Sequence, residues 1–252
     1  MYKFIIALSF LVIASNITAQ ESKRKSFFHA EVGGGYPVGN FGNVNDSTGN
    51  FAKVGYQFGI SAEHILFKYI GVKATYNFAM NGFRKKTYER NMKFPEVDES
   101  GASTTNETSF QASSQRYMSN SLLAGVFLNY PVENVSFGLE ALYGPAITRY
   151  PESTRAKRVS DGETSGLVES FTNDKTNGFS WAFNTAFHIR YNINDGYYIF
   201  RVGYYNTTTN YSNVNITREY VENGNALENN YQADTKLTYE IITLSIGVGI
   251  SL

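Results

Sequence analysis

Six charged residues, three acids and three bases, recur in segments that are otherwise apolar, glycine-rich or weakly polar: Glu31, Glu63, Lys73, Glu140, Arg190 and Arg201. Each shares its alternate positions with small or polar residues, and the intervening positions are mostly apolar or aromatic. If these segments are β-strands, the six side chains point to one side of a sheet. An unpaired charge costs too much free energy to stay buried, and equal numbers of both signs permit complete pairing. The pattern therefore favours a structural ion-pair network, with a narrow charged conductance path as the alternative.

Other kinds of chemistry find few candidates in the sequence. There is no cysteine, which excludes thiol catalysis, disulfides and cysteine-bound zinc. The histidines are His29, His64 and His188, and none belongs to a carboxylate or histidine cluster with metal-ligand spacing. We expect no catalytic residue, no metal and no cofactor. A net charge of +0 argues against a nucleic-acid partner, and 15% aromatic residues argue against disorder.

The elements that carry the charged residues are predicted as strands, because apolar residues recur in them with a period of two. Four segments alternate clearly between an apolar face and a small or polar face, at 54–63, 72–81, 179–191 and 242–252. Four more alternate less regularly, at 28–36, 121–130, 135–143 and 198–205. In the 121–130 segment, Leu123 and Phe127 fall on the small or polar face and obscure its assignment. The prediction is eight antiparallel strands.

The N-terminus predicts export from the cytoplasm. Lys3 precedes an apolar run over 4–14, and Ala19 ends a small-residue cleavage site. We assign 1–19 to a signal peptide and 20–252 to one mature domain. No later stretch approaches the length of a transmembrane helix. A membrane protein without spanning helices must be a closed barrel, since every backbone amide in lipid needs a partner.

The connections between the predicted strands alternate in length. Those after the second, fourth and sixth strands are short, at 67–69, 132–134 and 194–196, where Asp195-Gly196 is expected to supply the positive φ of a tight turn. Those after the first, third, fifth and seventh strands are long and polar, at 37–52, 83–115, 147–177 and 206–235. Outer-membrane barrels have short periplasmic turns and long external loops. The alternation thus predicts that both termini are periplasmic and that the four long loops lie outside the cell.

Two stretches resemble a known family. Val32-Gly33-Gly34-Gly35-Tyr36-Pro37-Val38-Gly39-Asn40-Phe41-Gly42 is similar to the first strand and turn of the small outer-membrane β-barrels of Gram-negative bacteria, the outer-membrane protein β-barrel or porin-like domain. Leu123-Ala124-Gly125-Val126-Phe127-Leu128-Asn129-Tyr130-Pro131 resembles a middle strand of that family. The resemblance implies a closed antiparallel up-and-down barrel in the outer membrane. One departure is Leu252, where the family usually ends in an aromatic residue.

The long connections offer candidate contacts with other molecules. Two basic groups occur in them, Arg84, Lys85 and Lys86 in one and Arg155, Lys157 and Arg158 in another. They are candidates for binding an anionic surface polysaccharide or a protein ligand, and the alternative is solvated loops that pair weakly with one another. Val214, Ile216 and Arg218 alternate with polar residues, so a ten-stranded barrel is the alternative to eight strands.

These patterns predict an integral outer-membrane barrel of a Gram-negative bacterium, monomeric and surrounded by lipid, with a lumen filled by side chains. Its role would be structural or would depend on interactions of its external loops. The first alternative is a narrow porin-like channel. The second is a lipid-modifying enzyme, which the three histidines disfavour because the topology places them toward the periplasmic rim, away from the outer leaflet. A soluble ligand-binding barrel would need the opposite polarity, with apolar residues inside.

Overall fold

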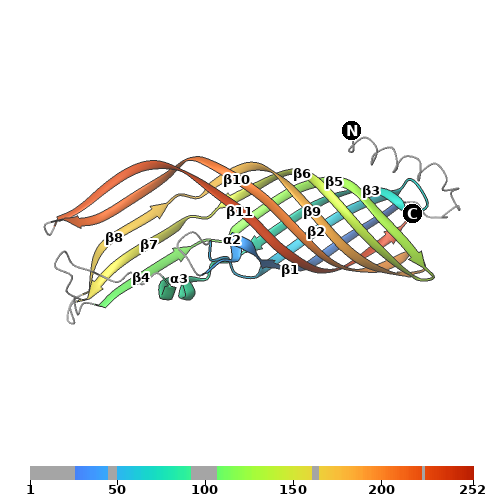
Figure 1. Cartoon of the computed structure of the whole chain (residues 1–252), viewed down its shortest axis with the longest axis horizontal. Helices are drawn as coiled ribbons and strands as arrows, with labels where there is room; N and C mark the ends of the chain where they lie inside the picture. Colours follow the sequence, from blue (N-terminus) through green and yellow to red (C-terminus); the bar gives the residue numbers. More distant parts are fainter. Residues whose placement is uncertain (1–25, 45–49, 92–106, 161–164, 223–224) are drawn as a thin grey trace, which may run out of the picture.

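The computed structural model describes residues 26–44, 50–91, 107–160, 165–222 and 225–252. Its main body is a closed ring of eight antiparallel strands (Figure 1). In chain order the ring strands are β1 (Ser26–Pro37), β2 (Gly55–Ile65), β3 (Ile70–Asn81), β5 (Tyr117–Val132), β6 (Val135–Tyr150), β9 (Thr176–Ile193), β10 (Gly196–Glu222) and β11 (Asn225–Ser251). Each ring strand pairs with the next one in the ring, and β11 pairs with β1 to close it. The predicted eight-stranded up-and-down barrel is confirmed. The predicted signal peptide at 1–19 lies outside the described residues.

Each strand presents apolar residues outward and small or polar residues inward. Outward-facing Val32 and Ile246 are 56% and 64% exposed, whereas inward-facing Arg190 and Arg201 are each 1% exposed. This polarity is the reverse of that in a soluble protein, because the exposed surface is apolar and the interior is charged. We call the band of outward apolar residues the apolar belt. A barrel of this kind needs an apolar surrounding, such as a lipid bilayer, to cover the belt.

Two of the connections between ring strands are two-residue turns at the end of the barrel where β1 begins and β11 ends. They are Glu133-Asn134 between β5 and β6, and Asn194-Asp195 between β9 and β10. The left-handed residues are Glu133 at φ 53° and Asn194 at φ 51°. The prediction that Gly196 would supply the positive φ is therefore wrong. Asparagine tolerates this region better than most residues with a side chain, so Asn194 can take the role expected of the glycine.

At the opposite end, the predicted long loops form additional strands, which is a correction to the expected loops. They are β4 (Glu107–Ser114), β7 (Ser153–Ser160) and β8 (Ser165–Asn173), and two short helices are α2 (Gly39–Gly42) and α3 (Lys85–Asn91). β4, β7 and β8 lead almost directly into or out of β5, β6 and β9, so part of the barrel wall continues past the belt (Figure 1). Together with the outer parts of β10 and β11 they form a sheet in the order β11-β10-β8-β7-β4, which we call the outer sheet.

The ten-strand alternative is wrong for the ring. Val214 and Ile216 do lie in a strand, but that strand is the outer part of β10, where it pairs with β11 and β8. The ring keeps eight strands because the three added strands attach beyond the belt. Within the part of the chain that the structure describes, no helix has the length and apolar character needed to cross a membrane.

Candidate functional site

The barrel interior brings the six predicted charged residues into one connected series of contacts. In spatial order the series is Arg190, Glu63, Lys73, Glu140, Arg201 and Glu31. Lys73 occupies the middle, with its Nζ 3.2 Å from Glu63 Oε1 and 2.7 Å from Glu140 Oε2. Glu63 and Lys73 are directly opposite one another in the β2–β3 register, whereas Glu140 is reached across the lumen from β6. Positive and negative charges alternate along the whole series.

The two arginines extend the series toward its ends. Arg190 forms an ion pair with Glu63, and Arg201 contacts Glu140. Arg201 Nη1 also lies 3.5 Å from Glu31 Oε1, and Arg201 Nη2 donates to Asn184 Oδ1 at 2.7 Å. All of these side chains are buried. A buried charge that keeps its partners is tolerated, whereas one that loses its partner is strongly destabilising.

Two of the three histidines adjoin this network. His29 lies 3.1 Å from the Tyr197 hydroxyl and 3.8 Å from Glu63, and His188 Nδ1 lies 3.7 Å from Glu140 Oε2. His64 is on the outer face and is hydrogen-bonded to Ser26 Oγ at 3.0 Å. All three lie in the half of the barrel near the short turns. Among the described residues, no group of three or more histidine, aspartate or glutamate side chains is arranged to hold a metal ion.

An apolar cluster closes the lumen on the short-turn side of the network. We call it the inner plug, and it consists of Phe27, Ile65, Phe127, Tyr197 and Ile199. The guanidinium of Arg190 lies over the rings of Phe27 and Tyr197, 4.3 and 4.5 Å from their centroids. Such contacts stabilise a desolvated cation. The plug therefore contacts the ion pairs through Arg190.

Glycines make room for the large inward side chains. Gly71 is directly opposite Phe127, and Gly249 is directly opposite Tyr197. A Cβ at Gly71 would lie 2.5 Å from the Phe127 ring, and one at Gly249 would lie 2.3 Å from the Tyr197 ring. Each aromatic ring thus lies across the bare backbone of the neighbouring strand. The side of the sheet on which Phe127 lies, ambiguous in the sequence, is the lumen.

A second apolar cluster closes the outer end of the lumen. We call it the outer plug, and Phe41 of α2 is at its centre, 0% exposed. The Phe41 ring lies 4.3 Å from that of Tyr239 and 5.2 Å from that of Tyr117, between centroids. Leu123 and Leu142 point into the same cluster from the barrel wall. The connection between β1 and β2 thus folds inward and supplies the residue that fills the mouth.

Sequence reasoning missed Phe41, which lies in a segment expected to be a polar external loop. The sequence feature that could have indicated the inward fold is the glycine two residues before Phe41. Gly39 has φ 56°, and a Cβ there would lie 1.9 Å from a Glu240 carboxylate oxygen, so this position requires glycine. A tight glycine turn that returns an aromatic residue to the barrel was present in the segment that resembles the family.

The two predicted basic groups do not form one common site. Arg84 Nε donates to the Ala52 carbonyl at 3.0 Å, and Lys85 lies 3.7 Å from Glu89 along α3. Lys86 is exposed on the same helix. Arg155 projects from β7, 5.5 Å from the ring centroid of Tyr88 in α3. Lys157 and Arg158 also belong to β7, but their side chains lie outside the described residues.

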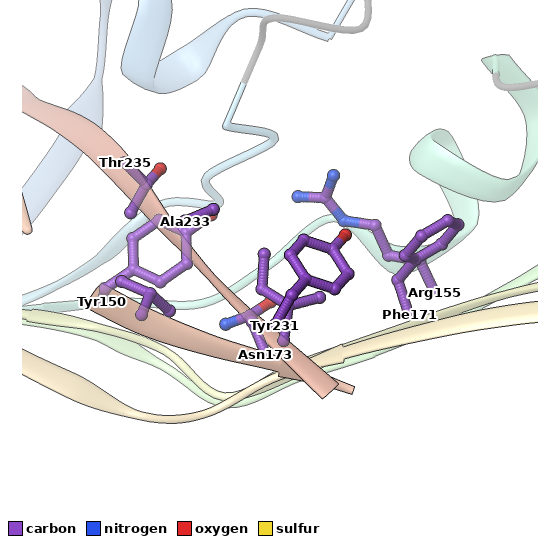
Figure 2. Close-up of a pocket in the computed structure, with 9 residues that line it drawn as sticks. Tyr150, Arg155, Phe171, Asn173, Tyr231, Ala233 and Thr235 are labelled. Atoms are coloured by element: carbon purple, nitrogen blue, oxygen red, sulfur yellow. The ribbon is translucent and has the colours of Figure 1, made fainter. Parts of the chain in front are cut away.

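Arg155 instead contributes to a pocket on the concave side of the outer sheet. We call it the rim pocket; it measures about 250 Å³ and is lined by Tyr150, Arg155, Phe171, Asn173, Val214, Ile216, Tyr231, Ala233 and Thr235. Figure 2 shows these side chains converging from several strands. Asn173 is already engaged, because its amide nitrogen donates to Pro151 O at 2.9 Å and its oxygen accepts from Ser153. Arg155 is the charged side chain among the residues that line the pocket.

The ring of eight strands, the apolar belt and the charged, plugged interior together decide what kind of protein this is. The fold is that of an integral outer-membrane β-barrel. In such barrels the short turns are periplasmic and the long connections are external. The inner plug is therefore at the periplasmic end, and the outer plug, the rim pocket and the outer sheet are at the cell surface.

No protein-family model matches the chain, and no curated protein matches its sequence significantly. Solved structures that resemble it include Neisserial surface protein A. That protein is 12% identical, the match covers 90% of this chain and 97% of that chain, and the TM-score is 0.35. A major outer membrane protein from Thermus thermophilus gives 12% identity, 90% and 99% coverage and a TM-score of 0.41. The attachment invasion locus protein Ail of Yersinia pestis was solved in complex with the heparin analogue sucrose octasulfate. It is 12% identical, the match covers 90% of this chain and 99% of that chain, and the TM-score is 0.39. The fold of this barrel is assigned from its strand ring and its polarity.

Proposed function

We propose that this outer-membrane barrel conducts no solutes and acts at the cell surface, with the outer sheet as the part that meets other molecules. The observation that supports the proposal is a succession of buried side chains inside the barrel. The inner plug, the alternating ion pairs and the outer plug follow one another along the barrel axis. An eight-stranded barrel is just wide enough for side chains to fill its interior.

The form of the outer sheet supports the second half of the proposal. A barrel needed only as a membrane anchor could end in short external turns, whereas here β10 and β11 each contain 27 residues and extend far beyond the belt (Figure 1). Folded strands outside the bilayer present a defined surface, as binding sites require. The barrel then serves to hold that surface outside the cell, as a monomer surrounded by outer-membrane lipid.

The test is single-channel recording with the refolded protein in planar bilayers. The expected result is the absence of stable conductance steps, with folding verified by heat-modifiable gel mobility. A stable open conductance from the heat-modifiable protein would reject the closed-barrel proposal in favour of a narrow channel.

The proposal contains no enzymatic step. Incubation of the folded barrel with lipopolysaccharide, phospholipid and peptide substrates checks this expectation, and turnover that depends on His64 or His188 would contradict it.

A further inference from the structure

The outer sheet has two edges, because it does not close into a ring. The walls made by β5, β6 and β9 continue outward as β4, β7 and β8, whereas β1, β2 and β3 end near the belt (Figure 1). One edge of the outer sheet is β4, whose described strand partner is β7. The other edge is the outer part of β11, whose described strand partner before the pairing with β1 begins is β10.

The two edges differ in how they are protected. Helix α3 packs on β4, where Glu89 Oε1 accepts the backbone N–H of Ala112 at 3.1 Å and Tyr88 packs in a buried cluster with Ala112 and Phe51. Covering an edge in this way prevents pairing with another chain. Helix α2 packs on β11 at Tyr239, but no described helix lies on the more distal part of this edge, and residues 225–232 are all exposed. Among the described residues, the β11 edge is thus the open one.

The rim pocket borders that open edge. Tyr231, Ala233 and Thr235 are successive inward-facing residues of β11 and form one wall of the pocket. Val214 and Ile216 are opposite Ala233 and Tyr231 in the β10–β11 ladder and form its floor. A strand added to the β11 edge would therefore place alternate side chains beside the pocket, since alternate residues of neighbouring strands share one face.

The residues that line the rim pocket favour one class of ligand over others. Two aliphatic side chains and the Phe171 ring provide an apolar surface, and the volume of about 250 Å³ is below the range of about 300–1,000 Å³ for pockets that take a drug-sized ligand. Arg155 contributes a positive charge, and no described carboxylate is paired with it. Asn173, the amide in the lining, already uses its oxygen and one N–H group within the protein. One apolar side chain with a nearby carboxylate fits these features better than a saccharide does.

We propose that the open β11 edge binds an extended segment of a partner protein by strand addition. An aromatic or large aliphatic side chain of that segment occupies the rim pocket, and an acidic side chain two residues away, on the same face of the segment, pairs with Arg155. Backbone hydrogen bonds supply affinity in this mode, and the pocket supplies specificity. This proposal rests on the proposed surface role of the outer sheet and names the partner chemistry for it.

The probe is a phage-displayed library of random linear peptides, selected on the full refolded barrel in detergent. The expected peptides share an aromatic or branched aliphatic residue close to an aspartate or glutamate. Ala233→Arg, which fills the pocket, should weaken their binding by about tenfold or more, as loss of a central anchoring contact does. The matched control Asn210→Arg adds the same side chain at an exposed position of β10, outside both the rim pocket and the β11 edge, and should leave affinity unchanged.

Two further measurements separate strand addition from simple pocket binding. Peptides methylated on alternate backbone nitrogens should lose binding in one of the two possible registers and keep it in the other. Arg155→Gln should weaken the acidic peptides and have no effect on versions in which the acid is replaced by its amide. Heat-modifiable mobility of each variant shows that it is folded.

Three results would overturn the proposal: no enriched peptide, equal binding to the Ala233→Arg variant, or retained binding in both methylated registers. Binding of glycans from an array, lost in Ala233→Arg, would replace the peptide by a saccharide and leave the surface role intact. Conductance is recorded on the same preparation. An open pore there rejects the closed barrel independently of the peptide result.

Discussion

The ring of Phe41 lies 4.3 Å from that of Tyr239, between centroids, at the outer mouth of the barrel. A residue from the connection between β1 and β2 therefore packs on the last strand of the ring and closes the lumen from outside. Since the ion pairs and the inner plug lie beneath it, three successive layers of buried side chains lie inside the barrel. The contribution of each layer to stability and to closure of the lumen can be measured with substitutions.

Phe41→Ala should destabilise the barrel without opening it. Removal of a buried phenylalanine side chain costs about 3–5 kcal/mol, and the remaining levels still block the lumen. Denaturant titration in detergent micelles, followed by the fluorescence of the single tryptophan, Trp181, gives the free energy of unfolding. Bilayer recordings of the same variant should remain silent. A conducting Phe41→Ala barrel would mean that the ion pairs do not obstruct passage.

Glu140→Gln should be more harmful than the double variant that also carries Lys73→Met. The single change removes the carboxylate shared by Lys73 and Arg201, and breaking a buried pair costs about 3–5 kcal/mol. The double change removes one charge of each sign and leaves Arg190 with Glu63 and Arg201 with Glu31. Unfolding free energies measure the difference.

The exposed turn residue offers a matched control for the Glu140 experiment. Glu133→Gln makes the same chemical change outside the lumen, at an exposed position between β5 and β6, and should be nearly neutral. If the double variant were as unstable as the sum of its two single variants, the ion-pair series would not be a coupled network.

Gly138→Ala should destabilise the barrel, because Gly138 lies directly opposite His188 and a Cβ would be 2.1 Å from its Nε2. Overpacking of this kind costs about 1–3 kcal/mol. The control is Gly34→Ala, where the nearest atom to an added Cβ is a backbone oxygen 3.8 Å away. Equal unfolding free energies for the two variants would contradict the tight fit of the ring against the backbone.

Ile246→Lys should impair insertion into lipid vesicles, since Ile246 is 64% exposed in the apolar belt. A lysine facing lipid costs about 2–4 kcal/mol near the bilayer midplane and much less near the interfaces. Thr238→Lys, on β11 beyond the belt, should insert normally. The change in Trp181 fluorescence during folding into vesicles measures the insertion of both variants. Normal insertion of Ile246→Lys would place the bilayer elsewhere on the barrel.

The eight ring strands could be predicted from sequence because lipid on one side and a polar lumen on the other impose alternation on every strand. The outer sheet escaped prediction for the same reason. Both faces of a strand outside the bilayer can be polar, as in the outer part of β11, where residues 225–232 are all exposed. If the two faces have the same polarity, apolar and polar residues do not alternate along the strand, and this pattern cannot predict the strand. β4, β7 and β8 therefore looked like loops.

The inward direction of the six charged residues could be predicted because each occupies the same set of alternate positions as the small or polar residues of its strand. Their pairing did not, because Lys73 on β3 and Glu140 on β6 meet across the lumen, and that distance depends on the stagger of the whole ring. Phe41 was missed because a single aromatic residue in a polar connection carries no periodic signal. The open β11 edge depends on which strands end early, and this is a property of three-dimensional pairing.

β10 and β11 each extend from the periplasmic end of the barrel into the outer sheet, and one ladder, with a register shift between Tyr211 and Val214, joins them along almost their whole length. A pull on that tip, directed away from the cell, acts along the strands. It loads in shear the backbone hydrogen bonds that join the hairpin to its neighbours, β10 to β9 and β11 to β1, whereas peeling would break them one after another. Tension on a segment bound at the open edge would therefore pass along this hairpin into the membrane-embedded wall.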